Sequence, residues 1–502
     1  MTIAAEPRYA PIETATLDGL ELFAELPDWL VAIVRPERVR SALERVIPEF
    51  ASGELALQGC EIRRMRIKKD RWIGIFQLTV GETHSGPSRL VQMQGMLFPP
   101  TTDDRTGTIY RASTTDEQPS IPFGIEGWRC YVPELRLLLE TQPPEVALLA
   151  LPVLTDPEQS RATLERGIRD GGVAYQDFRI QSCAPNVVRY KPGSRCTIVY
   201  RLAYLPEHAG HGWPALVVAK TYKGDKGRNA YAGMRRLWES PLGTSDVVTI
   251  AEPLAFIPEV NLLVQGPIRE EQTLKDLIRS ALRAGTPDAL AELDDYMRKT
   301  ARGLAALHRS GARHGDTTTW EDELAEVREV VEQLADAIPQ LADAAASLLA
   351  RLEALAAAHP PDPAVPSHRS FRPGQVLLNQ GKIGFIDFDS FGQAEPALDL
   401  ALFLSAMKNI GLSEPHEEES SEDDAALDDE ERLATLVRLE AICETFLAEY
   451  EQAAPISRQR VALWEALDLL SLTLTCWTKI KPVRLSNTML MLERYLSQTG
   501  IS

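Results

Sequence analysis

The chain has 502 residues, which is too long for one hydrophobic core, so we expect two to four domains. Its 44% hydrophobic and 25% charged residues are ordinary for a globular protein, and no apolar run approaches the roughly 20 residues of a membrane helix. The net charge of −19 disfavours nucleic-acid binding, because a phosphate backbone needs a basic face. The first residues lack the basic and apolar regions of a secretory signal, so we expect a cytoplasmic protein without membrane association.

The positions of the cysteines and of the acidic residues argue against some kinds of metal or substrate site. The six cysteines are scattered without Cys-x-x-Cys pairs, which argues against zinc and disulfides and indicates buried free thiols. Residues 414–431 contain eleven carboxylates and no Lys or Arg. Such a block repels itself, so we interpret it as an exposed insertion rather than a metal or substrate site.

Residues 1–150 are predicted to form an α+β domain. Residues 35–50 have apolar side chains at helical spacing, and residues 62–67, 72–80 and 89–98 are typical of strands. Residues 99–122 consist largely of Thr, Asp, Ser and Pro, which predicts a long loop.

The order helix, hairpin, strand occurs twice in the chain. Residues 35–45 align with 156–166, residues 71–78 with 195–202, and residues 90–94 with 216–220. This alignment places Gln94 where the second copy has Lys220. We interpret residues 1–150 as a degenerate duplicate of the following domain that can present a surface to a protein partner. The alternative is that two common patterns agree by chance.

Residues 151–270 are predicted to be rich in strands, with a hairpin at 187–202, a strand at 216–220 and a helix at about 228–239. Residues 271–502 are predicted to be mainly helical. Apolar residues recur at helical spacing in 288–307, 321–334, 341–357, 432–450, 458–479 and 489–496.

One stretch combines residues suited to a chemical site. It runs His-Arg-Ser-Phe-Arg-Pro-Gly-Gln over residues 368–375 and is followed by apolar runs at 376–378 and 383–388 around a polar turn. These runs predict a buried hairpin with Gln375 at one end and Asp387 at the other. Two oxygen donors held in this way suit a hard cation such as Mg²⁺.

This stretch resembles the catalytic loop and metal-binding segment of the aminoglycoside phosphotransferase and choline kinase-like family, with a glutamine in the loop as in maltokinase-like members. The resemblance implies a protein-kinase-like bilobal α+β fold, with residues 151–270 as the N-lobe and 271–502 as the C-lobe. It also implies ATP as co-substrate, Mg²⁺ as cofactor, and transfer of the γ-phosphate to an alcohol group of a small molecule. The family's catalytic aspartate is replaced by Ser370, which cannot hold a negative charge at neutral pH.

The resemblance also suggests residues that bind the nucleotide. Lys220 follows the apolar run 216–219, so strand alternation can turn its ammonium into a cleft, like the lysine that pairs nucleotide phosphates in kinase-like folds. Glu239 is the candidate partner of Lys220, and Arg195 lies in the hairpin turn that replaces a glycine-rich loop. Val264 and Gly266 lie where the adenine-reading hinge is expected.

The same comparison assigns roles around the loop. Gln375 and Asp387 are the candidate metal ligands, and Asp389 is a candidate for a second cation or an arginine. His368 resembles the histidine that orients the catalytic loop rather than one that transfers protons. Asp399 is expected to cap or brace a helix near the loop, as the matching family aspartate does.

A second motif, His314-Gly315-Asp316, spells the family's catalytic triplet. No Asn or Gln follows at the required spacing, and no Ile-Asp-Phe segment follows it. We therefore predict that Asp316-Thr317-Thr318 caps the helix at residue 321. A functional role for Asp316 would need a fold that brings it near the cleft.

Three functions fit the sequence. The first is an ATP- and Mg²⁺-dependent kinase of a small metabolite, because positioning and electrostatics supply most of the catalysis in phosphoryl transfer. The second is a pseudokinase that binds a nucleotide, a metabolite or a protein without turnover, which Ser370 favours. The third, a scaffold without nucleotide binding, is disfavoured by Lys220 and Asp387.

Overall fold

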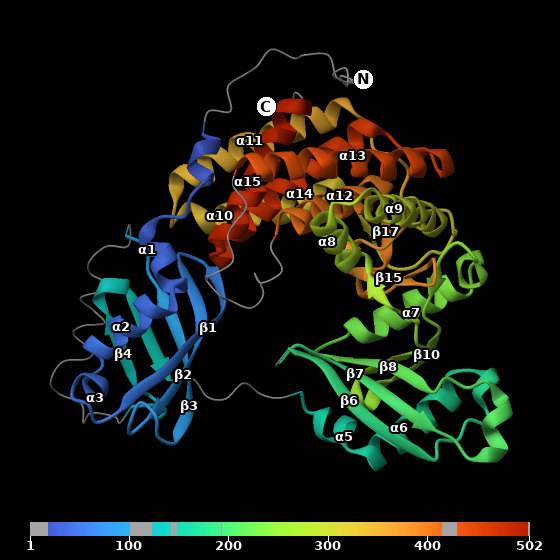
Figure 1. The fold of residues 1–502 in the computed structure, drawn as a ribbon, viewed down its shortest axis with the longest axis horizontal. Helices are drawn as coiled ribbons and strands as arrows, with labels where there is room; N and C mark the ends of the chain where they lie inside the picture. Colours follow the sequence, from blue (N-terminus) through green and yellow to red (C-terminus); the bar gives the residue numbers. More distant parts are fainter. Residues whose placement is uncertain (1–18, 101–122, 142–147, 192, 414–428, 500–502) are drawn as a thin grey trace. The chain divides into compact units, whose positions relative to one another are not determined.

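The computed structural model describes residues 19–100, 123–141, 148–191, 193–413 and 429–499 (Figure 1). These residues form helices and mostly antiparallel sheets, which confirms the predicted α+β class. The chain forms two compact units: Met1–Pro144, Glu321–Ala358 and Ala466–Ser502 make the first, and Glu145–Trp320 and His359–Glu465 the second. Two helical stretches of the predicted C-lobe 271–502 are therefore grouped with the N-terminal sheet, while the boundaries at 150 and 270 stay predictions.

The first unit contains a five-stranded sheet and helices from three parts of the chain. Its N-terminal helices are η1 (Leu20–Phe23), α1 (Asp28–Val31), η2 (Ala32–Val34), α2 (Pro36–Val46) and α3 (Pro48–Ala51). Its strands are β1 (Ala56–Lys68), β2 (Arg71–Gly81), β3 (Ser88–Leu97), β4 (Arg129–Val132) and β5 (Leu137–Thr141), with η3 (Pro133–Leu135) between the last two. The later helices are α11 (Pro339–Ala358), α15 (Pro482–Thr499), most of α10 (Trp320–Ala335) and the end of α14 (Arg458–Lys479).

Local chemistry explains two features of this unit. The helix predicted over 35–50 breaks at Ile47, which is extended because a residue before proline disfavours the helical conformation. The late helices join the sheet through buried indoles: Nε1 of Trp72 donates to the Trp477 carbonyl at 3.1 Å, and Nε1 of Trp477 donates to the Phe23 carbonyl at 3.3 Å. The predicted loop over 99–122 lies, from residue 101, outside the described residues.

The second unit begins with a β-rich lobe. Its helices are α5 (Leu151–Thr155), α6 (Pro157–Gly171), η4 (Val173–Tyr175), η5 (Pro206–His211), α7 (Lys226–Trp238), η6 (Pro241–Thr244) and η7 (Pro258–Val260). Its strands are β6 (Ser182–Lys191), β7 (Arg195–Ala203), β8 (Leu216–Tyr222), β9 (Thr249–Ile250), β10 (Pro253–Ile257) and β11 (Leu262–Gln265).

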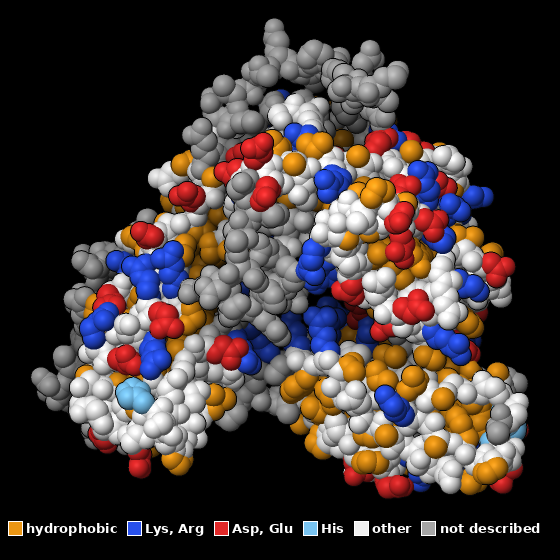
Figure 2. Space-filling view, viewed as in Figure 1, with side chains coloured by type: hydrophobic (Ala, Val, Ile, Leu, Met, Phe, Trp, Pro, Cys, Tyr) orange, Lys and Arg blue, Asp and Glu red, His pale blue; other side chains and the backbone are white. Residues whose placement is uncertain are grey.

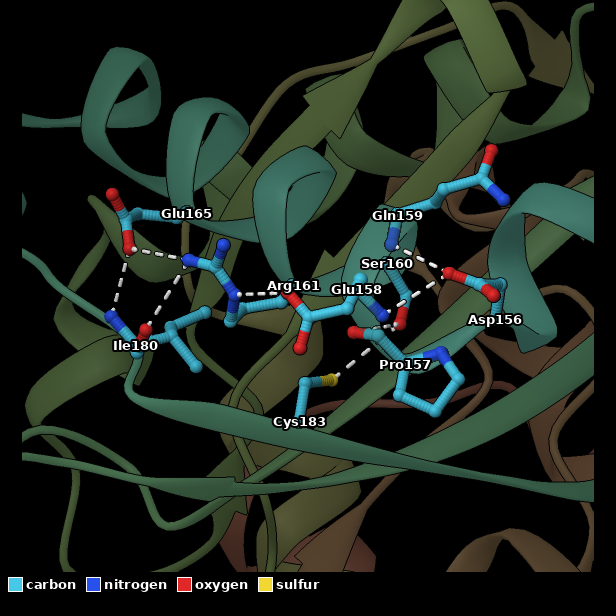
Figure 3. A network of polar contacts seen from close by, with 9 residues as sticks. All are labelled: Asp156, Pro157, Glu158, Gln159, Ser160, Arg161, Glu165, Ile180 and Cys183. Atoms are coloured by element: carbon cyan, nitrogen blue, oxygen red, sulfur yellow. Dashed lines mark hydrogen bonds and ion pairs between the residues drawn. The ribbon is translucent and has the colours of Figure 1, made fainter.

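Helix α6 covers one face of this second sheet. Its first turn is capped by Asp156, whose carboxylate accepts from the N–H groups of Glu158 at 3.1 Å and Gln159 at 2.8 Å (Figure 3). Ser160 lies 3.6 Å from the sulfur of Cys183 on β6, so the helix contacts the sheet directly (Figure 3). Apolar side chains are also exposed on β6 and β8, among them Val187, Val188, Tyr190 and Leu216, and Figure 2 shows hydrophobic side chains gathered over this lobe at the lower right.

The helical lobe holds two small sheets. Its helices are α8 (Leu274–Ala284), α9 (Pro287–His308), α12 (Pro396–Leu412), α13 (Asp429–Ala453) and the start of α14, with η8 (Pro373–Gln375) and η9 (Phe388–Ser390). One sheet has the order β12-β15-β16-β9, with β12 (Gln272–Thr273), β15 (Val376–Asn379) and β16 (Lys382–Phe385). The other has the order β13-β17-β14, with β13 (Thr317–Thr318), β14 (Val365–Ser367) and β17 (Gly392–Ala394).

The hairpin, the cysteines and the acidic block were also predicted from the sequence. The β15–β16 pair confirms the hairpin predicted after residue 375. All six cysteines are free, and four of them are buried while Cys60 and Cys130 are half-buried. Of the acidic block, residues 414–428 lie outside the described residues, whereas 429–431 form the exposed first turn of α13. The predicted insertion 414–431 therefore includes three residues that belong to a helix. Carboxylates are favourable in a first helical turn, because they interact with the positive end of the helix dipole.

The two five-stranded sheets share one topology. The first has the order β1-β2-β3-β5-β4 and the second β6-β7-β8-β11-β10. In each, a short 3-10 helix that begins with Pro-Glu joins the last two strands, and it ends on a left-handed residue, Arg136 (φ 51°) or Asn261 (φ 46°). The interpretation of residues 1–150 as a degenerate copy stays a prediction.

The strand register corrects one detail of that comparison. Ile73 lies between Arg66 and Met96 in the first sheet, and Thr197 lies between Arg189 and Lys220 in the second. Ile73 and Thr197 both lie two positions beyond the first residue of the strand that follows the hairpin turn. Their partners on the next strand therefore correspond, and Met96 matches Lys220. The predicted match of Gln94 with Lys220 is wrong. A shift of two residues leaves the same face buried, so the alternating sequence pattern could not reveal it.

Candidate functional site

Lys220 lies on the central strand β8 with its ammonium turned away from the hydrophobic core. Its neighbours Val217 and Ala219 are fully buried in that core, so strand alternation puts Lys220 on the other face. Its Nζ contacts Oδ1 of Asp387 and lies 3.1 Å from Oδ1 of Asp389. The predicted lysine and two of the predicted metal ligands therefore meet at one point of the second unit.

A hydroxyl and a further positive charge also lie close to Asp389. The hydroxyl of Tyr222 donates to Oδ1 at 2.9 Å, and a guanidinium nitrogen of Arg195 lies 3.8 Å from Oδ2. Burial and the charge of Asp389 raise the pKa of Tyr222, so its hydroxyl stays protonated and donates. Sequence reasoning missed Tyr222, although its place two residues after Lys220 puts both side chains on one face of the strand.

Asp387 is held ionised by this cluster. Burial alone would favour the protonated carboxyl, but the adjacent Lys220 ammonium outweighs burial and keeps the pKa of Asp387 below its ordinary value. Its backbone is left-handed, with φ 70°, which is uncommon for a residue other than glycine. A carboxylate held in such a conformation after a buried strand is typical of a functional position.

The loop before the hairpin is fixed by a buried carboxylate. Asp399 on α12 is fully buried and accepts from the backbone N–H groups of His368 at 2.6 Å and Arg369 at 2.7 Å. Nε2 of His308 lies 3.2 Å from it. Burial opposes ionisation, but His308 and the N–H of His368 keep the pKa of Asp399 below its ordinary value. Asp399 thus braces the loop itself, in which Arg369 has a φ of 62°, whereas the sequence predicted that it braces a helix near the loop.

Ser370 and His368 form a side-chain pair within this loop. Oγ of Ser370 lies 3.2 Å from Nδ1 of His368, and Nε2 of His368 lies 2.9 Å from the carbonyl oxygen of Ile386. A carbonyl only accepts hydrogen bonds, so Nε2 carries the proton. In the neutral ring Nδ1 is then bare and accepts the hydroxyl proton of Ser370. Position 370 therefore presents a hydroxyl bonded to an imidazole.

The oxygen donors fit a hard divalent cation. Asp387 and Asp389 both contact one ammonium group, so their oxygens already surround a single positive charge. Gln375 lies at the other end of the hairpin, where its Oε1 accepts from the N–H of Arg372 at 2.9 Å. Carboxylate and amide oxygens are the ligands that Mg²⁺ prefers. No cluster of three or more His, Cys, Asp or Glu suited to a metal occurs among the described residues.

The predicted partner of Lys220 lies elsewhere. Glu239 follows α7 and pairs with Arg235 of that helix at 2.7 Å, so the predicted pairing with Lys220 is wrong. The hinge candidates lie beside the site: Val264 is opposite Ala219 on β11, and the N–H of Gly266 donates to the Glu252 carbonyl at 2.8 Å.

The His314-Gly315-Asp316 segment has a different local structure from the predicted one. Thr317 and Thr318 form strand β13, parallel to β17, instead of a helix cap. Strand β17 also pairs with β14, which leads into the loop at His368. The segment thus lies one strand away from the loop, with the side chain of Asp316 exposed.

The two lobes and the Lys220, Asp387 and Asp389 cluster have the arrangement expected of a kinase-like phosphotransferase. Residues 271–463 match the phosphotransferase enzyme family, which confirms the predicted resemblance over the part of the chain that holds the loop and hairpin. No match is found among curated proteins.

Several solved structures are similar to the chain. A choline/ethanolamine kinase family protein from Mesorhizobium loti is 14% identical, with 62% of this chain and 88% of that chain covered and a TM-score of 0.41. An aminoglycoside phosphotransferase from Streptomyces rimosus is 20% identical, with 62% and 98% covered and a TM-score of 0.35. A glucosamine kinase is 14% identical, with 94% and 99% covered and a TM-score of 0.45.

Proposed function

We propose that the protein transfers the γ-phosphate of ATP to an alcohol group of a small molecule, with Mg²⁺ as cofactor. The contact of Lys220 with both Asp387 and Asp389 carries this proposal. It joins a phosphate-binding ammonium and two metal-binding carboxylates, which are the parts that phosphoryl transfer requires. The family match over residues 271–463 supports the same reaction class.

Each side chain has a role that follows from its position. Asp387, Asp389 and Gln375 would hold the cation, which when bound neutralises charge on the phosphates. Lys220, released from the carboxylates, donates to phosphate oxygens, and Arg195 at the start of β7 adds a second positive charge. Tyr222 keeps Asp389 oriented through its hydroxyl. Asp399 fixes the backbone of the loop at His368 and Arg369, the two residues before Ser370.

A second function is favoured by one observation. Ser370 is bonded to His368 and offers no carboxylate to accept a substrate proton, so the protein would bind Mg²⁺ and nucleotide without turnover as a pseudokinase. Loss of a general base typically costs about 10²- to 10⁴-fold in rate, which weakens the reaction and does not by itself abolish it.

Melting curves with and without Mg²⁺-ATP, followed by phosphotransfer assays over a metabolite panel, test the proposal. We expect Mg²⁺-ATP to raise the melting temperature of the native protein and not that of Asp387→Asn. Phosphate transfer that Asp387→Asn abolishes supports the kinase. Nucleotide binding without transfer supports the pseudokinase, and an unchanged melting temperature rejects both.

Other sequence-based expectations stay predictions. These are the cytoplasmic location, the absence of nucleic-acid and membrane binding, and a protein partner that binds residues 1–150. No helix among the described residues is long and apolar enough to cross a membrane.

A further inference from the structure

We propose that Ser370 is itself phosphorylated by the bound nucleoside triphosphate, with His368 as the base that takes its proton. This inference rests on the proposed function, because it needs the nucleotide to occupy the site at Lys220 and Asp387. It assigns a covalent modification site to the position where the family carries its aspartate.

The first reason is the pairing of a nucleophile with a base. The hydroxyl of Ser370 lies 3.2 Å from Nδ1 of His368, within hydrogen-bond reach. The ring is oriented by a third group, because Nε2 bonds the Ile386 carbonyl at 2.9 Å and leaves Nδ1 as the acceptor. A nucleophile, a base and a group that orients the base form the arrangement that activates serine hydroxyls in enzymes.

The second reason is that the base is held rigidly. His368 is fully buried, and its ring packs against Phe388 and Phe371 with centroids 4.8 and 5.5 Å away. The basic side chain next to it in the sequence, Arg369, lies close to Gly392.

The third reason is position and accessibility. The carbonyl that orients His368 belongs to Ile386, the residue directly before Asp387, so the Ser370–His368 pair is connected to the Lys220 cluster through adjacent residues. Ser370 is half-buried, whereas Ser367 is fully buried and its hydroxyl is bonded to the carbonyls of Val365 and Ala394. Ser370 is therefore the loop serine whose hydroxyl has both a base and access.

The proposed step is balanced. The Oγ–H bond of Ser370 breaks and its proton goes to Nδ1 of His368. The Oγ–phosphorus bond forms while the bond from the γ-phosphorus to the bridging oxygen breaks, and the nucleoside diphosphate leaves with that oxygen. An aspartate in this position would repel the phosphate and form a labile acyl phosphate, whereas serine is neutral and forms a stable ester.

The test uses full-length protein that has first been treated with a phosphatase. It is incubated with Mg²⁺ and γ-labelled ATP without any small-molecule acceptor, denatured, and mapped by mass spectrometry. We expect acid-stable phosphate on the Ser370 peptide, no label in Ser370→Ala, and phosphothreonine in Ser370→Thr. Ser390→Ala, a variant of an exposed serine in η9, is the matched control and should label like the native protein.

Each remaining outcome decides the inference. An acid-labile label, or label confined to another hydroxyl, overturns it. Transfer to a metabolite without label at Ser370 overturns it as well and leaves the proposed function standing. If Mg²⁺-ATP produces neither label nor a shift in melting temperature, the proposed function fails together with the inference. His368→Gln, provided that its melting temperature shows it to be folded, should lose the label and retain the nucleotide-induced shift.

Discussion

Met96 occupies in the first sheet the position that Lys220 occupies in the second. Each lies opposite the residue two positions beyond the first residue of the strand after the hairpin turn, Ile73 and Thr197 respectively. The two sheets therefore differ at the residue that would bind phosphate, because a thioether carries no charge. Only the second sheet is expected to bind a nucleotide.

Replacing the lysine with its counterpart tests this difference. Lys220→Met should weaken Mg²⁺-ATP binding about 10- to 100-fold, because a hydrogen bond to a charged group contributes about 1.5–3 kcal/mol. Isothermal titration calorimetry of the full chain measures the change. Met96→Leu is the matched control, and a comparable loss in that variant would show that the first sheet also contributes.

Glu239, which follows α7, is expected to be dispensable for nucleotide binding. Glu239 pairs with Arg235 on the surface of its own helix, and such exposed pairs contribute about 0–1 kcal/mol. Glu239→Gln should therefore change nucleotide affinity less than about twofold. A loss as large as that of Lys220→Met would mean that the lysine exchanges partners when the nucleotide binds.

Asp399, the buried carboxylate that binds the loop, is expected to contribute strongly to the free energy of unfolding. Asp399→Asn removes a charged acceptor of two backbone N–H groups and should lower the free energy of unfolding by about 2–4 kcal/mol, measured by urea denaturation. Asp246→Asn, at an exposed position, is the control and should change it by less than about 0.5 kcal/mol.

Asp399 also predicts a dependence on pH. Its folded-state pKa is lowered, so its contribution is complete above the unfolded value of about 4 and is lost as the pH falls through the folded value. Unfolding curves of the native protein should therefore lose stability at acid pH. In Asp399→Asn, the free energy of unfolding should lack this part of the decrease at acid pH. The same decrease in both proteins would contradict the lowered pKa of Asp399.

A carboxylate can be introduced at the position of Ser370. Ser370→Asp should raise phosphate transfer to a small-molecule acceptor by about 10²- to 10⁴-fold, because the carboxylate accepts the acceptor's proton. The same variant should lose any acid-stable self-label. Ser370→Asn is the control, because asparagine has the shape of aspartate without the basic carboxylate oxygen. Equal activity of Ser370→Asp and Ser370→Asn would show that the gain does not come from proton acceptance.

Local sequence determined much of the site. The spacing from His368 to Gln375, the hairpin up to Asp387 and the orientation of Lys220 on its strand depend on period-two alternation and turn residues, which are encoded within a few positions. The structure has the same hairpin, and it places Lys220 with Asp387 and Asp389.

Tertiary packing decided the rest. Lys220 pairs with carboxylates 167 and 169 residues away rather than with Glu239, because ion pairing depends on which side chains the two lobes bring together. The match of Met96 to Lys220 needed the strand register, which an alternating pattern leaves undetermined by two residues. Likewise, the hydrogen bond between Ser370 and His368 follows from Ile386 and Asp399 fixing the ring and the backbone, and both reach the loop only through the fold.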